Sequence, residues 1–338
     1  MKPFAIAGIQ MHVLPERNID GIRQRLKLLM HYYPWVEMVL LSELAPFGSS
    51  LHYAQHLPGP AEEEFRQMAR EHGIWFVPGS LYEKRDGAIY NTSPVINPQG
   101  EVIARYSKMF PFTPFEEGVT AGDQFCVFDV PEVGRFGVLN CYDIWFPETM
   151  RTITAMGAEV ILHPVMTHTI DRDIDLAVAK ASAAMFQCYI FDINGLAAGG
   201  NGQSAVFDPS GRVVHQSSTN EEFIPIEIDL DQVRHQRQRG MRHLGQPMKS
   251  FRDRKIEFPV YDRSFDRAYL ESLGPLVRPG RHRSREATAA APVSIGQSLP
   301  VQPGNVGAAE PKEQLGRMFL RDSANPSEPP APDTFLSK

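Results

Sequence analysis

The stretch GVLNCYDIWFPETMR (137–151) decides the fold class of this chain. It continues an apolar run, RFGVLN (135–140), that predicts a buried strand. After Cys141, Pro147 marks the first turn of a helix that we expect to run through Met156, because proline suits that position. A strand that leads into a helix in this way is typical of α/β proteins.

The same patterns extend over most of the chain. Helices alternate with strands early, and hairpins follow in the middle and at the end. Apolar runs predict strands at 4–11, 37–41, 74–82, 89–97, 101–108, 125–130, 135–140, 159–164, 188–194, 203–208, 213–216 and 223–229. Helical spacing predicts helices from Ile22 to Tyr33 and at 61–73, 147–156 and 173–187. This order predicts an α/β protein with a mixed sheet, or two packed sheets, covered by helices.

Three polar residues follow predicted strands directly: Glu43, Lys108 and Cys141. Ligand sites in α/β sheets lie beyond the carboxyl ends of strands, so the three can meet in one pocket. A cysteine thiolate is a nucleophile, a glutamate in a partly apolar pocket can take its proton, and a lysine can hold an oxyanion. Each residue alone also fits an ordinary role: a small core residue, a turn cap and the end of an edge hairpin.

Composition restricts the class of protein. The 338 residues are 42% hydrophobic and 22% charged, which excludes a wholly disordered, collagen-like or coiled-coil chain. A net charge of −6 argues against a nucleic-acid binder. Three widely spaced cysteines, at 126, 141 and 188, exclude a disulfide framework and a thiolate zinc site. The N-terminus does not read as a signal peptide and no apolar run suits a membrane span, so we expect a cytoplasmic protein.

The C-terminal part differs from the rest in amino-acid composition and periodicity. Residues 279–338 hold 9 of the 28 prolines and show no sustained periodicity. Such a segment buries too little apolar surface to offset its ordering entropy, so we predict a largely disordered tail. The predicted organisation is one catalytic domain at 1–262 and a tail at 263–338.

Four stretches, in order along the chain, resemble the nitrilase superfamily of carbon–nitrogen hydrolases. They are LLSELAPFG (40–48), ARYSKMFPFTPFEEG (104–118), GVLNCYDIWFPETMR (137–151) and FQCYIFDINGLAAGGNGQSAVFDPSGRVV (186–214). The resemblance implies a four-layer α-β-β-α sandwich that assembles through its helical faces into a homodimer or larger homo-oligomer. It also implies that Glu43, Lys108 and Cys141 form a catalytic triad.

The resemblance further implies a two-step acyl transfer that needs no metal or organic cofactor. The Cys141 thiolate attacks an amide carbonyl, Lys108 and the backbone N–H of Tyr142 hold the oxyanion, and Glu43 moves the protons. Many members of the superfamily add a second glutamate after the lysine. Glu116 and Glu117 both fit this position, and we favour Glu116, which leaves Glu117 as a loop cap.

The motif around the cysteine also indicates the substrate class. The chain has C-Y-D where nitrile-cleaving members have C-W-E, which favours amides and carbamoyl compounds. Relatives that take carboxylates often have an arginine four residues after the cysteine, but this chain has Trp145 there. Trp145 either packs in the core or lines the pocket. Arg172 is a candidate to meet a substrate carboxylate in its place. We therefore predict a small neutral or apolar amide as substrate. The alternatives are an N-carbamoyl amidase or a nitrilase on the same triad, or a catalytically weak oligomeric binding scaffold.

Three further features have simpler interpretations. His163, His168 and Asp171 fit no common metal-ligand spacing, and we assign His163 to the pocket edge or core. The glycine-rich run 195–204 precedes a strand, so it does not predict a phosphate cradle. The segment 233–255 has eight Lys or Arg and one Asp, and by resemblance we expect it at a subunit interface, facing an acidic neighbour, rather than on nucleic acid.

Overall fold

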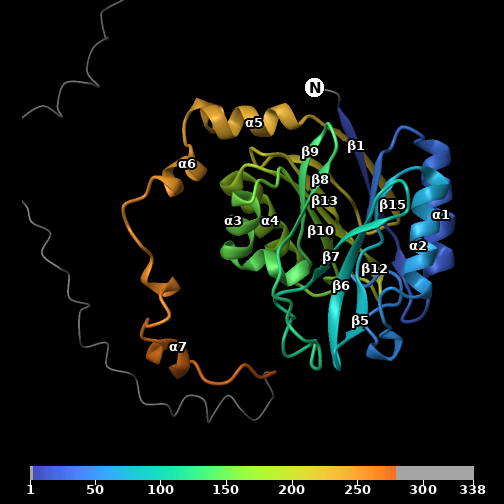
Figure 1. Cartoon of the computed structure of the whole chain (residues 1–338), viewed down its shortest axis with the longest axis horizontal. Coiled ribbons are helices and arrows are strands. Elements are labelled where there is room, and N and C mark those ends of the chain that lie inside the picture. Colours follow the sequence, from blue (N-terminus) through green and yellow to red (C-terminus); the bar gives the residue numbers. More distant parts are fainter. Residues whose placement is uncertain (1–2, 279–338) are drawn as a thin grey trace, which may run out of the picture. The chain divides into compact units, whose positions relative to one another are not determined.

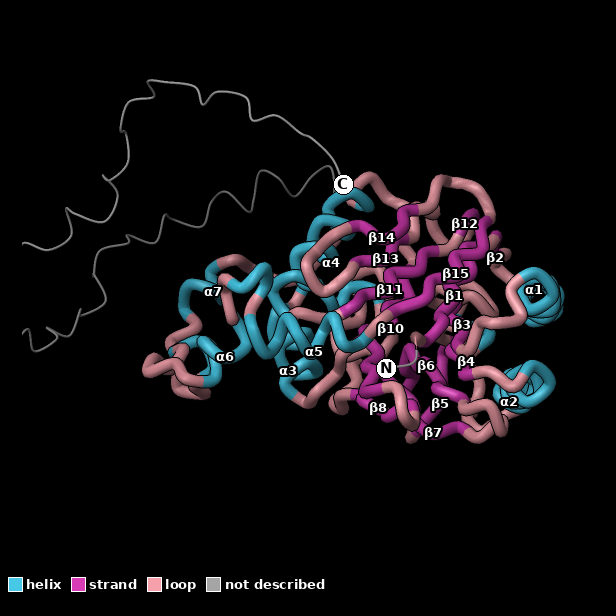
Figure 2. The backbone as a smooth tube through the Cα atoms, turned by 90° about the horizontal axis from the view of Figure 1, so that it is seen from above, coloured by secondary structure: helices cyan, strands magenta, loops and turns pink. Residues whose placement is uncertain are grey.

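Two β-sheets pack face to face, and helices cover the outer face of each (Figure 1). The computed structural model describes residues 3–278. Seen from above, α1 (Ile19–Tyr32) and α2 (Pro60–His72) lie on one side of the strands, and α3 (Pro147–Ala155) and α4 (Arg172–Phe186) lie on the other (Figure 2). The predicted α-β-β-α sandwich is confirmed.

The first sheet has the order β15-β1-β3-β4-β6-β5, with β7 paired to β6. Its bounds are β1 (Phe4–Gln10), β3 (Met38–Leu41), β4 (Trp75–Val77), β5 (Leu81–Arg85), β6 (Ala88–Ile96), β7 (Val102–Ser107) and β15 (Glu222–Ile228). Strands β1, β3 and β4 are parallel, and the hairpin strands are antiparallel. Every residue of β1 and β3 is buried, because helices cover one face and the second sheet covers the other.

The second sheet has the order β14-β13-β11-β10-β9-β8. Its bounds are β8 (Cys126–Val130), β9 (Gly134–Val138), β10 (Val160–Val165), β11 (Tyr189–Asn194), β13 (Ala205–Phe207) and β14 (Val213–Gln216). Strands β9, β10 and β11 are parallel, so their carboxyl ends lie at one edge. A small two-stranded sheet pairs β2 (His12–Val13) with β12 (Leu196–Ala197). Strand β12 lies at the start of the glycine-rich run 195–204.

Local sequence accounts for the helix ends. In α2, Pro60 occupies the first turn, and Gly73 ends the helix with a left-handed φ of 64°, as its position in the sequence predicts. The remaining described helices are α5 (Leu230–Arg239), α6 (Pro247–Arg252) and α7 (Ala268–Ser272), and the 3-10 turns are η1 (Leu51–Tyr53), η2 (Cys141–Trp145), η3 (Met241–His243) and η4 (Pro259–Tyr261). None of the helices within residues 3–278 has the length and apolar character to cross a membrane.

The structure differs from the predicted strand at 74–82. This run is two strands, β4 and β5, separated at Gly79, which has φ 81°. A Cβ atom at Gly79 would lie 1.9 Å from the carbonyl oxygen of Ser42. The break therefore lets the chain pass directly against the residue before Glu43.

The predicted tail begins inside the described region. Residues 263–278 are exposed and include the short helix α7, whereas 279–338, where most of the tail was predicted, lie outside the described residues.

Candidate active site

The three polar residues predicted at strand ends come together where the two sheets meet. Glu43 follows β3, and its backbone N–H donates to the carbonyl oxygen of Val165 in the second sheet, at 3.2 Å. Lys108 follows β7, and Cys141 follows β9 at the start of η2. The charges of Glu43 and Lys108 both act on the Cys141 thiol, so one site contains all three.

A buried network of charges surrounds Lys108, which is 1% exposed. Its Nζ atom lies 2.8 Å from Oε1 of Glu43 and 2.6 Å from Oε2 of Glu116. Glu116 also accepts a hydrogen bond from the backbone N–H of Phe112, at 2.6 Å. Glu117 is exposed. Of the two candidate glutamates, Glu116 is therefore the one that contacts Lys108.

Asn91 is a member of this network that the sequence analysis missed. Its Nδ2 donates to Oε1 of Glu43 at 2.8 Å and to Oε1 of Glu116 at 3.0 Å. It is fully buried on β6, and its backbone carbonyl oxygen accepts a hydrogen bond from the backbone N–H of Lys108 at 2.8 Å. The available signal was the polar run N-T-S inside a predicted strand, since buried polar side chains need partners.

The network separates the proton affinities of the two glutamates. Burial raises the pKa of Glu43 above its ordinary value, although Lys108 opposes this. Burial also acts on Glu116, but Lys108 and the hydrogen bonds to that carboxylate bring its pKa below the ordinary value. The carboxylates overcome burial at Lys108 and raise its pKa well above 10.5. Of the two glutamates, Glu43 therefore has the higher proton affinity, and it lies beside a lysine that stays charged.

Cys141 sits in a strained turn. Its φ is 47°, in the left-handed region that few residues other than glycine adopt. Asn140 and Asp143 form a capping box around it, and Asp143 also accepts hydrogen bonds from Tyr106 Oη at 2.6 Å and from the N–H of Phe110 at 2.8 Å. These contacts hold the turn that presents the thiol to Glu43.

Electrostatics distinguishes Cys141 from the other two cysteines by its neighbours. Burial and the Glu43 carboxylate raise the pKa of Cys141 well above 9.0, while Lys108 and the N–H of Met166 oppose this. These neighbours favour the protonated thiol, which lies beside the Glu43 carboxylate. Burial alone raises the pKa of Cys126 to about 12, and raises that of Cys188 to about 12 against a weak opposing charge.

Aromatic rings cluster next to Cys141. The ring of Tyr142 lies 5.0 Å from that of Phe112 and 5.2 Å from that of Phe146, both edge to face. Phe112 stacks on Phe115 at 4.9 Å, and both are exposed. We call these rings the aromatic wall; it is an apolar surface beside Cys141.

Trp145 is held by a polar contact. Its indole N–H donates to Oδ1 of Asp175 at 2.8 Å, and Thr167 donates to the other oxygen at 2.7 Å. Arg172, the candidate to meet a carboxylate, is buried and pairs with Asp192. Within the described residues, neither Trp145 nor Arg172 therefore supplies a positive charge without an ion-pair partner next to Cys141.

The remaining candidates lie apart from the thiol or behind it. His163 is buried behind Cys141, and one of its ring nitrogens contacts the carbonyl oxygen of that residue at 2.9 Å. His168 is exposed and Asp171 precedes α4. Within residues 3–278, no group of three or more His, Cys, Asp or Glu side chains is arranged to hold a metal ion.

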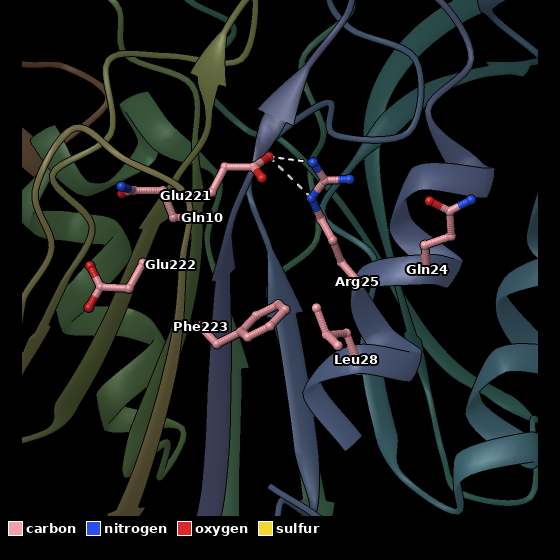
Figure 3. A pocket seen from close by; sticks show the side chains of 7 residues that line it. All are labelled: Gln10, Gln24, Arg25, Leu28, Glu221, Glu222 and Phe223. Carbon is pink, nitrogen blue, oxygen red and sulfur yellow. Dashed lines mark hydrogen bonds and ion pairs between the residues drawn. The ribbon is translucent and has the colours of Figure 1, made fainter. Parts of the chain in front are cut away.

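A cavity of about 370 Å³ lies elsewhere, between α1 and the start of β15 (Figure 3). Figure 3 shows Arg25 on α1 reaching across to Glu221, with which it forms an ion pair. Phe223 and Leu28 close the other end. None of its lining residues belongs to the Glu43–Lys108 network, so this cavity is separate from the candidate site.

The basic segment 233–255 is partly used inside its own chain. Arg234 on α5 donates to Oε1 of Glu159 at 2.7 Å, and Arg237 donates to the carbonyl oxygen of Gln187 at 3.0 Å. Arg151 and Arg254 lie over the ring of Phe251, at 4.1 and 4.2 Å. These contacts attach the segment to the second helical layer.

Comparison with known proteins identifies both the class of the protein, a hydrolase of carbon–nitrogen bonds, and its family. The sequence profile of the carbon-nitrogen hydrolases matches residues 5–238, so the chain belongs to the carbon-nitrogen hydrolase family. This confirms the predicted nitrilase-superfamily resemblance and enzyme class.

Two curated relatives illustrate the likeness. An omega-amidase of Xenopus laevis is 27% identical over 259 residues, which cover 68% of this chain and 90% of that protein. A 2-oxoglutaramate amidase of Bacillus subtilis is 29% identical over 241 residues, covering 68% and 92%.

Solved structures share the fold. Nit3 of Saccharomyces cerevisiae, a member of branch 10 of the nitrilase superfamily, aligns with a TM-score of 0.64 at 23% identity and covers 70% of this chain and 94% of its own. A carbon-nitrogen hydrolase of Helicobacter pylori aligns with a TM-score of 0.66 at 22% identity, covering 76% and 96%.

Proposed function

We propose that the protein is a cysteine-dependent amidase that hydrolyses a small neutral or apolar amide to a carboxylic acid and ammonia or an amine. The observation that carries this proposal is the ammonium of Lys108, held between Glu43 and Glu116 beside a thiol in a strained turn. The names of the two curated relatives, both amidases, support an amide as the substrate.

In the first step Glu43 takes the proton of Cys141, and the sulfur attacks the amide carbonyl carbon. Lys108 and the backbone N–H of Tyr142 hold the resulting oxyanion. The C–N bond then breaks, and Glu43 returns the proton to the leaving nitrogen, so a thioester remains on Cys141. The raised pKa of Glu43 suits both transfers, because the group must accept and then release a proton.

In the second step water attacks the thioester. Glu43 takes a proton from the water, and Lys108 and Tyr142 again hold the oxyanion. Glu43 then returns that proton to the sulfur, which leaves as the thiol. The sum is one amide and one water giving one acid and one amine. Glu116 accepts from Lys108 and from the backbone at once, so it orients the lysine without a proton transfer of its own.

The aromatic wall supports a neutral or apolar acyl group. Tyr142 and Phe112 are in contact beside the thiol, and Trp145 is engaged with Asp175. A carboxylate placed here would meet the negative charge of Asp175 instead of a free arginine. An apolar amide gains from burial against the rings and loses nothing to repulsion.

The test is ammonia release from a panel of amides, carbamoyl compounds and nitriles. We expect turnover of small apolar amides, no turnover after Cys141→Ala, and unchanged turnover after Cys126→Ala. Intact-mass spectrometry of enzyme quenched during turnover should show one acyl group on the protein. Full activity in Cys141→Ala would overturn the proposal. Release of carbon dioxide together with ammonia would show that the substrate is a carbamoyl compound, and consumption of a nitrile would show that it is a nitrile.

We also propose that the protein forms a homo-oligomer in the cytoplasm and uses the segment after α6 as an interface. Ten large apolar side chains between Ile256 and Val277 are exposed, which is more than isolated surface residues account for. Light scattering should give a multiple of 37.9 kDa, and the double change Leu270→Asp and Leu273→Asp should lower it. A monomeric mass for the unchanged chain would contradict this.

A further inference from the structure

His163 connects the nucleophile to a buried carboxylate. It lies on β10 and is 1% exposed. Its Nε2 atom is 2.9 Å from the carbonyl oxygen of Cys141, and its Nδ1 atom is 2.9 Å from Oδ2 of Asp192 on β11. The proposed mechanism gives this ring no proton to transfer.

Both partners of the ring accept hydrogen bonds. A backbone carbonyl has no proton to give, and the other oxygen of Asp192 pairs with Arg172. Burial opposes ionisation of Asp192, but Arg172 and His163 bring its pKa below the ordinary value. A neutral imidazole has a single N–H, so one of its two nitrogens would face an acceptor with a lone pair and form no hydrogen bond. The contacts therefore require an imidazolium with a proton on each nitrogen.

The surroundings of the ring favour this charge. Burial would lower the pKa of His163, but the hydrogen bond and the charge of Asp192 raise it overall, against a smaller opposing effect of Arg172. Asp175, also on α4, lies 4.0 Å from Arg172. From the first sheet, Glu43 and Lys108 act on Cys141 with opposite signs. The ring thus faces one carboxylate directly and one arginine behind it.

The bond to Cys141 controls the peptide that follows. In a planar trans peptide the C=O of Cys141 and the N–H of Tyr142 point in opposite directions. A donor that holds the oxygen from behind therefore aims the N–H toward the opposite side. Within the described residues, no acceptor takes the N–H of Tyr142. A charged donor on the oxygen also polarises the peptide and strengthens its N–H as a donor.

We propose that His163 is a positioning residue which, as an imidazolium held by Asp192, aims and polarises the Cys141–Tyr142 peptide whose N–H binds the oxyanion. This rests on the proposed function, because it assigns His163 to the oxyanion site of that reaction. It also explains how a residue with φ 47° keeps one backbone orientation: its carbonyl oxygen is held by a buried side chain.

The first test reads the protonation state without any substrate. Protein labelled with ¹⁵N in its eleven histidine rings gives a pair of signals for each ring, one per nitrogen, and the pair lost in His163→Gln belongs to His163. We expect that pair to show two ring protons at pH 7, and the signals of exposed His31 on α1 to be unaffected by the substitution. A singly protonated ring at pH 7 would overturn the proposal, whatever the activity of the enzyme.

The second test compares two substitutions in a single-turnover acylation assay. Glutamine reaches the place of ring Nε2 and keeps a neutral donor for Cys141, whereas asparagine reaches only toward Asp192. Because loss of one oxyanion donor costs about 100- to 1000-fold, we expect a loss of about 10- to 100-fold in His163→Asn, where the donor is misaligned but present. In His163→Gln the loss should stay below about tenfold, and KM should change little in both.

The controls separate this proposal from the proposed function. His31→Asn should acylate like the unchanged enzyme, and the melting temperatures of both His163 variants identify any general loss of fold. Acylation at the full rate in folded His163→Asn, or equal losses in the Asn and Gln variants, would overturn the positioning role. Turnover by Cys141→Ala would instead defeat the proposed function, while the ring signal would still report the state of His163.

Discussion

Replacement of Asn91 by alanine tests the acid–base assignment most directly. Asn91 donates to Glu43 at 2.8 Å and to Glu116 at 3.0 Å, and both bonds stabilise the ionised carboxylates. Loss of a hydrogen bond to a charged group costs about 1.5 to 3 kcal/mol. Since about 1.4 kcal/mol corresponds to one pKa unit, the pKa of Glu43 should rise by about one to two units.

The lower end of that range is expected, because Lys108 still donates to the same oxygen, Oε1 of Glu43. The reaction needs ionised Glu43 to take the thiol proton, so activity falls as the pH drops through the pKa of this group. The acid limb of kcat/KM should therefore move to higher pH by about one unit in Asn91→Ala.

The assay is kcat/KM for the best amide measured across the acid range, with the melting temperature at each pH. Thr92→Ala is the matched control, because Thr92 is the next residue on β6 and its hydroxyl donates to Glu83 at 2.7 Å, outside the candidate site. Thr92→Ala should lower stability without moving the acid limb. An acid limb at the same pH in Asn91→Ala and in the unchanged enzyme would refute the role of Glu43 as the base.

Three further predictions concern the same region. Glu116→Gln should lower kcat/KM by about 10- to 100-fold, since it removes the carboxylate that orients the lysine, whereas exposed Glu117→Gln should leave it unchanged; the reverse order would show that the wrong glutamate is assigned. At neutral pH an alkylating thiol probe should label Cys141 faster than the two buried cysteines, as peptide mapping will show, and equal slow labelling would favour a scaffold. Gly79→Ala should lower the unfolding free energy by about 2 to 4 kcal/mol, because its Cβ would lie 1.9 Å from a backbone oxygen, and Gly73→Ala, with open space around it, by about 1 kcal/mol; equal melting temperatures would contradict this.

Much of the fold follows from local sequence patterns. Apolar runs and helical spacing predict nearly every long strand and helix. The reason is that an element buried on one or both faces needs apolar residues at regular intervals along the chain. The strand at 74–82 is an exception. Its apolar pattern continues through Gly79, and only the approach of Ser42 from another strand requires the break.

The sequence by itself determined the family, through four motifs in order along the chain, and it gave the three strand-end candidates Glu43, Lys108 and Cys141, since a polar side chain directly after a buried strand is a local signal. It left the choice between Glu116 and Glu117 open, because adjacent residues in a loop differ only in which one turns inward. The tertiary structure places Glu116 against Lys108 and adds Asn91 to the network. It also gives His163, which the sequence analysis assigns to the pocket edge or core, its contact with the carbonyl oxygen of Cys141. Asn91 is 48 residues from Glu43, and the His163 ring lies 22 residues from the carbonyl that it contacts. Such partners carry no common pattern along the chain, because the order of the strands within each sheet brings them within hydrogen-bond distance.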